Sequence, residues 1–218
     1  MAMTAVIDAW FDFGCPFSML TRRLLAAELE DFGPAVRWYP HEAPGGARNR
    51  LPAARVWERG VRPLADRLGV PVHREPPPPA PTRLALQGYH YAVDRGRGSA
   101  YSDQVFDAYF RERLDIADPG VLAGAAGRAG LDPERFLAAV DSPRYAQRHR
   151  TAVARWPSVR TTPTVVSGGY RVEGVPNAVQ LARIVALSGR RPPGPARRVM
   201  AGAAAPGTAP CRVAETPP

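Results

Sequence analysis

Short runs of hydrophobic and β-branched residues predict the strands of a sheet at four places: residues 4–11, 35–39, 164–167 and 170–172. Gly168 and Gly169 separate the last two runs, and a Gly-Gly link between strands is typical of a β-hairpin. Residues 16–30 have helical spacing and connect the first two runs. Strand, helix and strand predict a βαβ unit with a parallel strand pair and a ligand crevice at the strand ends.

A long middle region has helical rather than strand periodicity. Residues 53–68 predict one helix, and residues 70–82, with four consecutive prolines, predict an extended connector. Residues 83–156 predict further helices. A capping residue before a proline marks three of the starts: Asp118-Pro119, Asp132-Pro133 and Ser142-Pro143. The pattern indicates an α/β domain with an inserted all-helical subdomain.

The end of the chain predicts a last helix followed by a tail without structure. Residues 177–187 form the helix, and its expected apolar set is Val179, Ala182, Ile184, Val185 and Leu187. From residue 190 onward the chain is rich in Arg, Pro, Gly and Ala and almost lacks large apolar side chains. Such a composition cannot bury a core, so we expect 190–218 to be disordered.

Length and composition fit an ordinary globular protein. The chain has 218 residues with 45% hydrophobic residues, enough for one domain with an insertion. No stretch approaches the roughly 20 apolar residues that span a bilayer, so no membrane association is expected. Residues 1–8 lack the basic start of a signal peptide. We therefore expect a cytoplasmic protein, in which a lone thiol stays reduced.

The net charge is +9, and every basic residue other than histidine is arginine. With 20 Gly and 25 Pro, this looks like the codon bias of a GC-rich genome. The arginines are dispersed and no binding motif accompanies them, so nucleic acid is not expected as a partner. A small molecule or an acidic partner such as an acyl carrier protein fits the charge. The sequence leaves open whether the chain forms a homodimer.

Cys15 is the strongest candidate for chemistry. It lies between the first predicted strand and the first predicted helix, with Pro16 at the first helical position. The unpaired N–H groups and the positive end of that helix favour thiolate over thiol. The residue three positions later is Ser18, where a C-x-x-C redox pair would have its second cysteine. A nucleophilic thiolate without a neighbouring thiol points to addition chemistry more than to electron transfer.

Other candidate residues have weaker signals. Ser18 lies one helical turn on and could hydrogen-bond the Cys15 sulfur, or could be a helix-surface serine. His41 follows the second strand and could donate to an enolate oxygen or shuttle a proton, or could be a solvated loop residue. His90 is more simply a packed histidine than a catalytic one, and His73 and His149 are assigned no role. The spacing of histidines and cysteines predicts no metal site, and no cofactor is expected.

The order of these motifs resembles the DsbA-like branch of the thioredoxin superfamily over residues 4–188. Four segments are similar to the corresponding segments of this family: residues 11–18 around Cys15, residues 115–132, residues 159–166, and residues 173–176 with the helix that follows. The resemblance implies a thioredoxin fold formed by residues 1–42 and 157–189, with 43–156 as the helical insert. It also implies a cis peptide bond between Thr162 and Pro163, against Cys15, where the Thr162 backbone would bind substrate.

Ser18 departs from the family pattern, because DsbA-like oxidases carry a second cysteine there. Cys211 could replace it only from the predicted tail. Related groups without the second cysteine are the kappa-class glutathione transferases and the 2-hydroxychromene-2-carboxylate isomerases, whose turn usually has Ser in place of Cys15. This chain therefore resembles proteins on both sides of the oxidoreductase–isomerase division.

These features lead to three functional hypotheses. The first is a cis-trans isomerase that adds the Cys15 thiolate reversibly to a conjugated polyene or enone, in polyketide biosynthesis and on a carrier-bound chain. Phe13 and Phe17 would then line the substrate slot, or belong to the core. The second is a monothiol disulfide oxidoreductase, or a glutathione-transferase-like thiol transferase, that uses an external low-molecular-weight thiol. The third is a binding module without redox activity.

Overall fold

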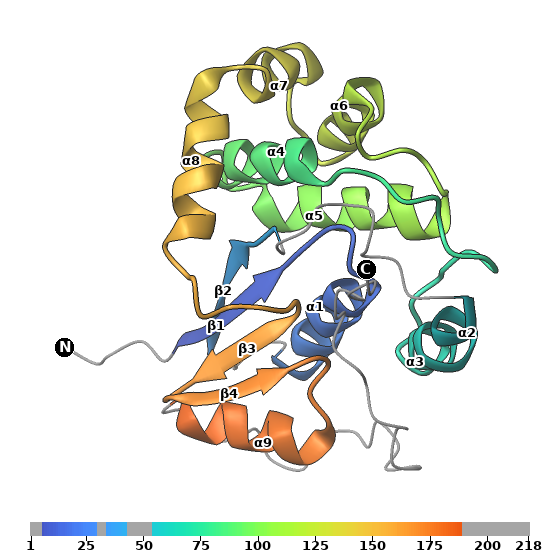
Figure 1. The fold of residues 1–218 in the computed structure, drawn as a ribbon, viewed down its shortest axis with the longest axis vertical. Helices are drawn as coiled ribbons and strands as arrows, with labels where there is room; N and C mark the ends of the chain where they lie inside the picture. The colour runs from blue at the N-terminus through green and yellow to red at the C-terminus, as the bar shows by residue number, and fades with distance from the viewer. Residues whose placement is uncertain (1–5, 30–33, 43–53, 189–218) are drawn as a thin grey trace, which may run out of the picture.

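A four-stranded sheet with the order β2-β1-β3-β4 forms the centre of the structure (Figure 1). The computed structural model describes residues 6–29, 34–42 and 54–188. The strands are β1 (Val6–Phe11), β2 (Ala35–Pro40), β3 (Thr164–Ser167) and β4 (Tyr170–Glu173). β1 pairs in parallel with β2 and antiparallel with β3, and β3 pairs antiparallel with β4. The predicted βαβ unit and hairpin are thus confirmed. β2 extends one residue further than predicted, because Pro40 is its last residue.

The hairpin turn needs glycine at both of its central positions. Gly168 has φ +54° and Gly169 has φ +81°, a region that L side chains rarely adopt. Two successive residues with positive φ match the twist of the flanking antiparallel strands. The two glycines therefore explain the tight link between β3 and β4.

Two helices pack on one face of the sheet. They are α1 (Pro16–Leu29), which follows β1, and α9 (Ala178–Leu187), which follows β4. Leu25 of α1 and Leu181 and Ile184 of α9 are buried in one cluster with Ile7 and Ala9 of β1. This cluster forms the smaller of the two cores.

The apolar face of α9 differs from the predicted one. Leu181, Ile184 and Val185 are buried, whereas Val179 is 79% exposed and Leu187 is 42% exposed. Asn177 caps the helix, and its side chain and that of Gln180 each accept a backbone N–H of the other residue. This capping box fixes the helical phase so that Val179 points away from the sheet.

The inserted helices lie between β2 and β3 in the sequence and gather beyond the strand ends, at the top of Figure 1. They are α4 (Arg83–Val93), α5 (Gly98–Phe106), α6 (Pro119–Arg128), α7 (Pro133–Val140) and α8 (Pro143–Ala154). The short helices α2 (Ala54–Val56) and α3 (Arg62–Arg67) stand apart from them, beside α1. π-helical segments continue α2 and α5: η2 (Trp57–Val61) and η3 (Asp107–Arg111). The limits of the domains stay predictions. The predicted tail, residues 190–218, lies outside the described residues.

Two of the three predicted helix caps are present. The Asp118 carboxylate accepts the Gly120 N–H at the start of α6, and the Asp132 carboxylate accepts the Arg135 N–H at the start of α7. Ser142 precedes α8 as predicted, but its hydroxyl donates backward to the Ala139 carbonyl at 2.5 Å. Its hydroxyl thus bonds the end of α7 rather than capping α8.

Aromatic side chains join the insert to the sheet. Phe11 at the end of β1 lies edge-on to Tyr89 of α4, with ring centroids 5.0 Å apart, and near Phe106 of α5 at 6.3 Å. These rings belong to the larger core, which extends through the helical insert. The end of β1, and the turn that follows it, is therefore held between the two parts of the fold.

Candidate active site

The turn that contains Cys15 is fixed by hydrogen bonds to Asp12. The Asp12 carboxylate accepts the Gly14 N–H at 3.0 Å, and the Asp12 carbonyl accepts the Cys15 N–H at 3.1 Å. Pro16 begins α1 with no N–H of its own, as suits the first helical position. The sequence of a buried strand, a short turn and a proline therefore places Cys15 directly before the N-terminus of the helix.

The Cys15 sulfur faces the segment that precedes β3. Its thiol donates to the Thr162 carbonyl at 3.2 Å, across 147 residues of sequence. The Thr162–Pro163 peptide bond is cis, which confirms the bond geometry implied by the family resemblance. The Pro163 carbonyl accepts the Gly174 N–H at 2.8 Å, which ties this segment to the end of β4. Cys15 is 2% exposed, so local opening must precede contact between the sulfur and a substrate.

Ser18 is bonded to the turn from within α1. Its hydroxyl accepts the Asp12 N–H at 3.3 Å, while its own N–H donates to the Cys15 carbonyl at 3.0 Å. The Ser18 side chain is fully buried, so it is not a helix-surface serine. The hydroxyl thus braces the turn around Cys15; a catalytic role for it stays a prediction.

The two phenylalanines beside Cys15 pack in the core. Phe13 is fully buried, with ring centroids 5.2 Å from Phe11 and 5.0 Å from Phe106. Phe17 is 4% exposed, and a Cβ built on Gly60 of η2 would lie 3.7 Å from its ring. Both residues therefore belong to the same buried cluster as Cys15, and contact with a substrate needs movement of the groups that cover them.

His41 lies near the Cys15 turn along the sheet edge. The backbone N–H of His41 donates to the Phe11 carbonyl at 2.8 Å, next to the start of the turn. The side chain is 3% exposed, so His41 is not a solvated loop residue. The backbone bond places His41 beside the ends of β1 and β2, as expected from the parallel pairing.

A second group of polar side chains was not predicted as a cluster. His149 of α8 and His90 of α4 are buried, with ring centroids 5.7 Å apart. His149 Nε2 lies 3.6 Å from Glu42 Oε2, and Arg83 donates to both oxygens of that carboxylate. Burial, and then the nearby His149, lowers the pKa of His90 to about 3, so His90 is neutral at ordinary pH.

This cluster joins the end of β2 to α4 and α8. His90 is thus a packed histidine, as favoured from the sequence, whereas no role was predicted for His149. No local spacing connects Glu42 with His149, because the contact forms only when the insert folds back on the strand. His73 lies apart from it, where its ring accepts the Glu75 N–H at 3.1 Å.

Among the described residues, no group of three or more His, Cys, Asp and Glu side chains is placed to hold a metal ion. No helix in the described part of the chain is long and apolar enough to cross a membrane. Cys211 lies outside the residues that the structure describes, and its role as a second thiol stays a prediction.

The model of the DSBA-like thioredoxin domain matches residues 6–186, and the chain belongs to this family. The uncharacterized protein YwbO of Bacillus subtilis (strain 168) is 27% identical over 182 residues, covering 79% of this chain and 91% of YwbO. The family match agrees with the sheet order, the cis-proline and the inserted helices described above.

Two solved structures show the same fold. One is a 2-hydroxychromene-2-carboxylate isomerase, with a TM-score of 0.71, 21% identity and coverage of 82% of this chain and 93% of that chain. The other is a probable DsbA oxidoreductase from Streptomyces coelicolor, with a TM-score of 0.72, 23% identity and coverage of 93% and 97%. The fold is therefore shared with proteins named as isomerase and as oxidoreductase.

Proposed function

We propose that this protein is a cis-trans isomerase of conjugated double bonds that uses Cys15 as a reversible nucleophile. The observation that supports this most is the contrast between the two positions of the active-site turn. Cys15 presents its sulfur to the Thr162 carbonyl, while the residue at the second position of a C-x-x-C pair is a serine bonded to the backbone. An active-site turn with one cysteine and no second thiol at position 18 suits a reaction that begins and ends with the same thiol.

The proposed reaction conserves atoms and electrons. The Cys15 thiolate adds to the β- or δ-carbon of a conjugated carbonyl compound, and the π electrons move to the carbonyl oxygen as an enolate. The former double bond is now single and rotates. The enolate electrons then restore the double bond and expel the thiolate. Because nothing is oxidised or reduced, no second cysteine, metal or redox cofactor is required.

His41 is the residue that we propose for stabilising the enolate. Its backbone bond to the Phe11 carbonyl holds it at the strand end from which the Cys15 turn begins. A hydrogen bond to a developing oxyanion in a site with little water is worth more than the same bond in solvent. Phe13 and Phe17 would bound the path of a flat, conjugated chain behind the sulfur.

A carrier-bound polyketide chain is the substrate that we infer from charge. The +9 net charge would attract an acidic carrier protein and speed its encounter with this chain. We place the reaction in the cytoplasm, where the thiol stays reduced. The structural neighbour named as an isomerase supports isomerisation as a reaction that this fold can host.

The test follows the geometry of a conjugated dienoyl thioester by chromatography, without added thiol and without oxygen. We expect wild-type protein to drive the E and Z isomers to their equilibrium ratio, and Cys15→Ser to leave the uncatalysed rate. Equal rates for the two proteins would contradict the proposal.

A monothiol oxidoreductase or thiol transferase is the alternative, and the oxidoreductase neighbour favours it. It would form a mixed disulfide at Cys15 and need an external low-molecular-weight thiol to release it. Two results together would identify this function: the rate of disulfide reduction rises with added glutathione, and the protein does not isomerise the dienoyl thioester when glutathione is absent. A Cys15 that reacts in neither assay would indicate a binding module.

A further inference from the structure

A cavity of about 180 Å³ lies between α1, β2 and α5, away from the Cys15 turn. Its polar lining residues include Arg22, Arg23, Ser99 and Asp103. Its apolar lining residues include Leu25, Val36 and Trp38. Arg22 follows Cys15 by about two helical turns, roughly 10 Å along the axis of α1, so this cavity is separate from the thiol.

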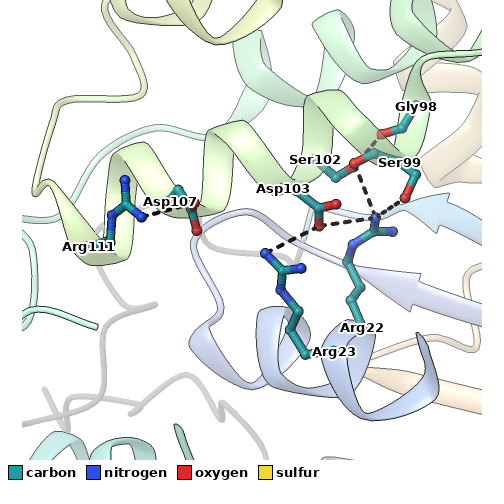
Figure 2. Close-up of polar contacts among 8 residues, drawn as sticks. All are labelled: Arg22, Arg23, Gly98, Ser99, Ser102, Asp103, Asp107 and Arg111. Atoms are coloured by element: carbon teal, nitrogen blue, oxygen red, sulfur yellow. Dashed lines mark hydrogen bonds and ion pairs between the residues drawn. The ribbon is translucent and has the colours of Figure 1, made fainter. Parts of the chain in front are cut away.

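The Arg22 guanidinium faces this cavity with incomplete hydrogen bonding, although only 6% of its side chain is exposed. Its Nη2 lies 3.3 Å from Ser99 Oγ and 3.5 Å from the Ser99 carbonyl (Figure 2). Its Nε is buried and has no hydrogen-bond partner among the described residues. A buried donor that lacks an acceptor is costly, so the site is suited to an added acceptor.

Two cations share one carboxylate oxygen here. Arg22 Nη2 is 3.8 Å and Arg23 Nη2 is 4.0 Å from the same Asp103 Oδ1, both beyond hydrogen-bonding distance (Figure 2). One positive charge is therefore not balanced within the group. Trp38 offsets part of it, because the Arg22 guanidinium lies 4.7 Å from the centroid of that ring. Burial still lowers the pKa of Arg22, against the opposing effect of Asp103.

We propose that this cavity is a binding site for a small organic monocarboxylate with an apolar chain. The carboxylate would accept from the Arg23 guanidinium and, once the Arg22 side chain shifts to uncover it, from Arg22 Nε. The apolar chain would lie against Leu25, Val36 and Trp38. The surplus of one positive charge matches a monoanion. Asp103 would repel the second charge of a phosphate dianion, so the site favours carboxylate over phosphate.

The probe is hexanoate, titrated against the full chain and followed by chemical-shift changes of the amide and indole N–H groups. We expect saturable binding, with Trp38 among the perturbed indoles, and weaker binding of acetate and of inorganic phosphate. Arg23→Gln should weaken hexanoate binding roughly tenfold, because a charge-assisted hydrogen bond is lost. Arg23 is 42% exposed, so this variant should fold.

Asp103→Asn gives the opposite expectation, because it removes the competing anion and should tighten hexanoate binding. The matched control is Arg111→Gln. Arg111 pairs with Asp107 at 3.6 Å farther along the same helix, outside the cavity (Figure 2). It should leave the binding unchanged.

Three outcomes would overturn the proposal: no saturable binding of hexanoate to the wild type, equal loss with Arg23→Gln and Arg111→Gln, or unchanged binding in Asp103→Asn. The last result would show that Asp103 merely ties α1 to α5. The binding test does not use the thiol, so Cys15→Ser should bind hexanoate like the wild type. Failure of this site and failure of the proposed isomerase are therefore distinguishable.

Discussion

The Ser18 hydroxyl accepts the Asp12 N–H, and the Asp12 carbonyl and carboxylate accept the next backbone donors of the turn. These bonds determine where the Cys15 sulfur lies relative to the Thr162 carbonyl. A cysteine at position 18 would offer a second thiol, but its sulfur is a weaker acceptor for the Asp12 N–H. At the scale of single residues, the Ser18 hydroxyl therefore braces the turn at the position where a C-x-x-C pair has its second thiol.

Ser18→Ala should lower the free energy of unfolding by about 1–3 kcal/mol, because the buried Asp12 N–H loses the hydroxyl that accepts it. Thermal or denaturant unfolding measures the change. Ser18→Thr keeps a hydroxyl at this position and is the control, although its added methyl group must fit a fully buried site. An unfolding free energy of Ser18→Ala equal to that of the wild type would contradict a bracing role.

At the scale of elements, the insert depends on a close approach of α4 to its neighbours. A Cβ built on Gly88 of α4 would lie 2.6 Å from Phe136 Cζ of α7, and closer still to the hydroxyl of Tyr101 of α5. Both neighbours are large buried rings that cannot move aside easily. The absence of a side chain at Gly88 is thus a condition for packing three helices together.

Gly88→Ala should destabilise the protein by about 1–3 kcal/mol, despite the better helix propensity of alanine, because the added methyl group overpacks the contact. Gly124→Ala on α6 is the matched control, since Gly124 is exposed and its built Cβ meets only the Arg128 side chain, at 3.6 Å. That variant should be neutral or stabilised by up to about 1 kcal/mol. Equal melting temperatures for the two variants would contradict this account of the packing.

Elements that depend on near neighbours in the sequence were predicted correctly. They include the strand runs, the Gly168-Gly169 turn and the caps at Asp118 and Asp132. The prediction that Val179 lies on the apolar face of α9 was wrong, because the capping box and the position of the sheet set the phase of the helix and leave Val179 exposed. The π-helical continuations of α2 and α5 also depend on tertiary packing.

The candidate site was predictable only in part. Cys15 and its turn follow from local pattern, and the cis bond before Pro163 came from family resemblance rather than from the residues themselves. The contacts of His149 with His90 and Glu42 join three separate elements, so no spacing in the sequence could indicate them. The burial of Phe13 likewise results from packing against the insert, because its ring contacts Tyr101 and Phe106 of α5.

At the scale of the whole molecule, a thioredoxin-like sheet and a helical insert enclose one thiol between them. The fold is shared with an isomerase and an oxidoreductase, so the fold by itself does not determine the chemistry. The proposed distinction rests on what happens at Cys15: reversible addition to carbon, or exchange with another sulfur. A measurement that separates these two events decides between them.

The most direct measurement is isomerisation of a conjugated dienoyl thioester in D₂O without added thiol, with isomer ratio and deuterium content determined by chromatography and mass spectrometry. Reversible thiolate addition predicts that wild-type protein interconverts the E and Z isomers with no deuterium at the ε-carbon, and that Cys15→Ser does not accelerate the change. Interconversion accompanied by deuterium at the ε-carbon, which requires abstraction of a proton there, or a rate that Cys15→Ser retains, would contradict the account.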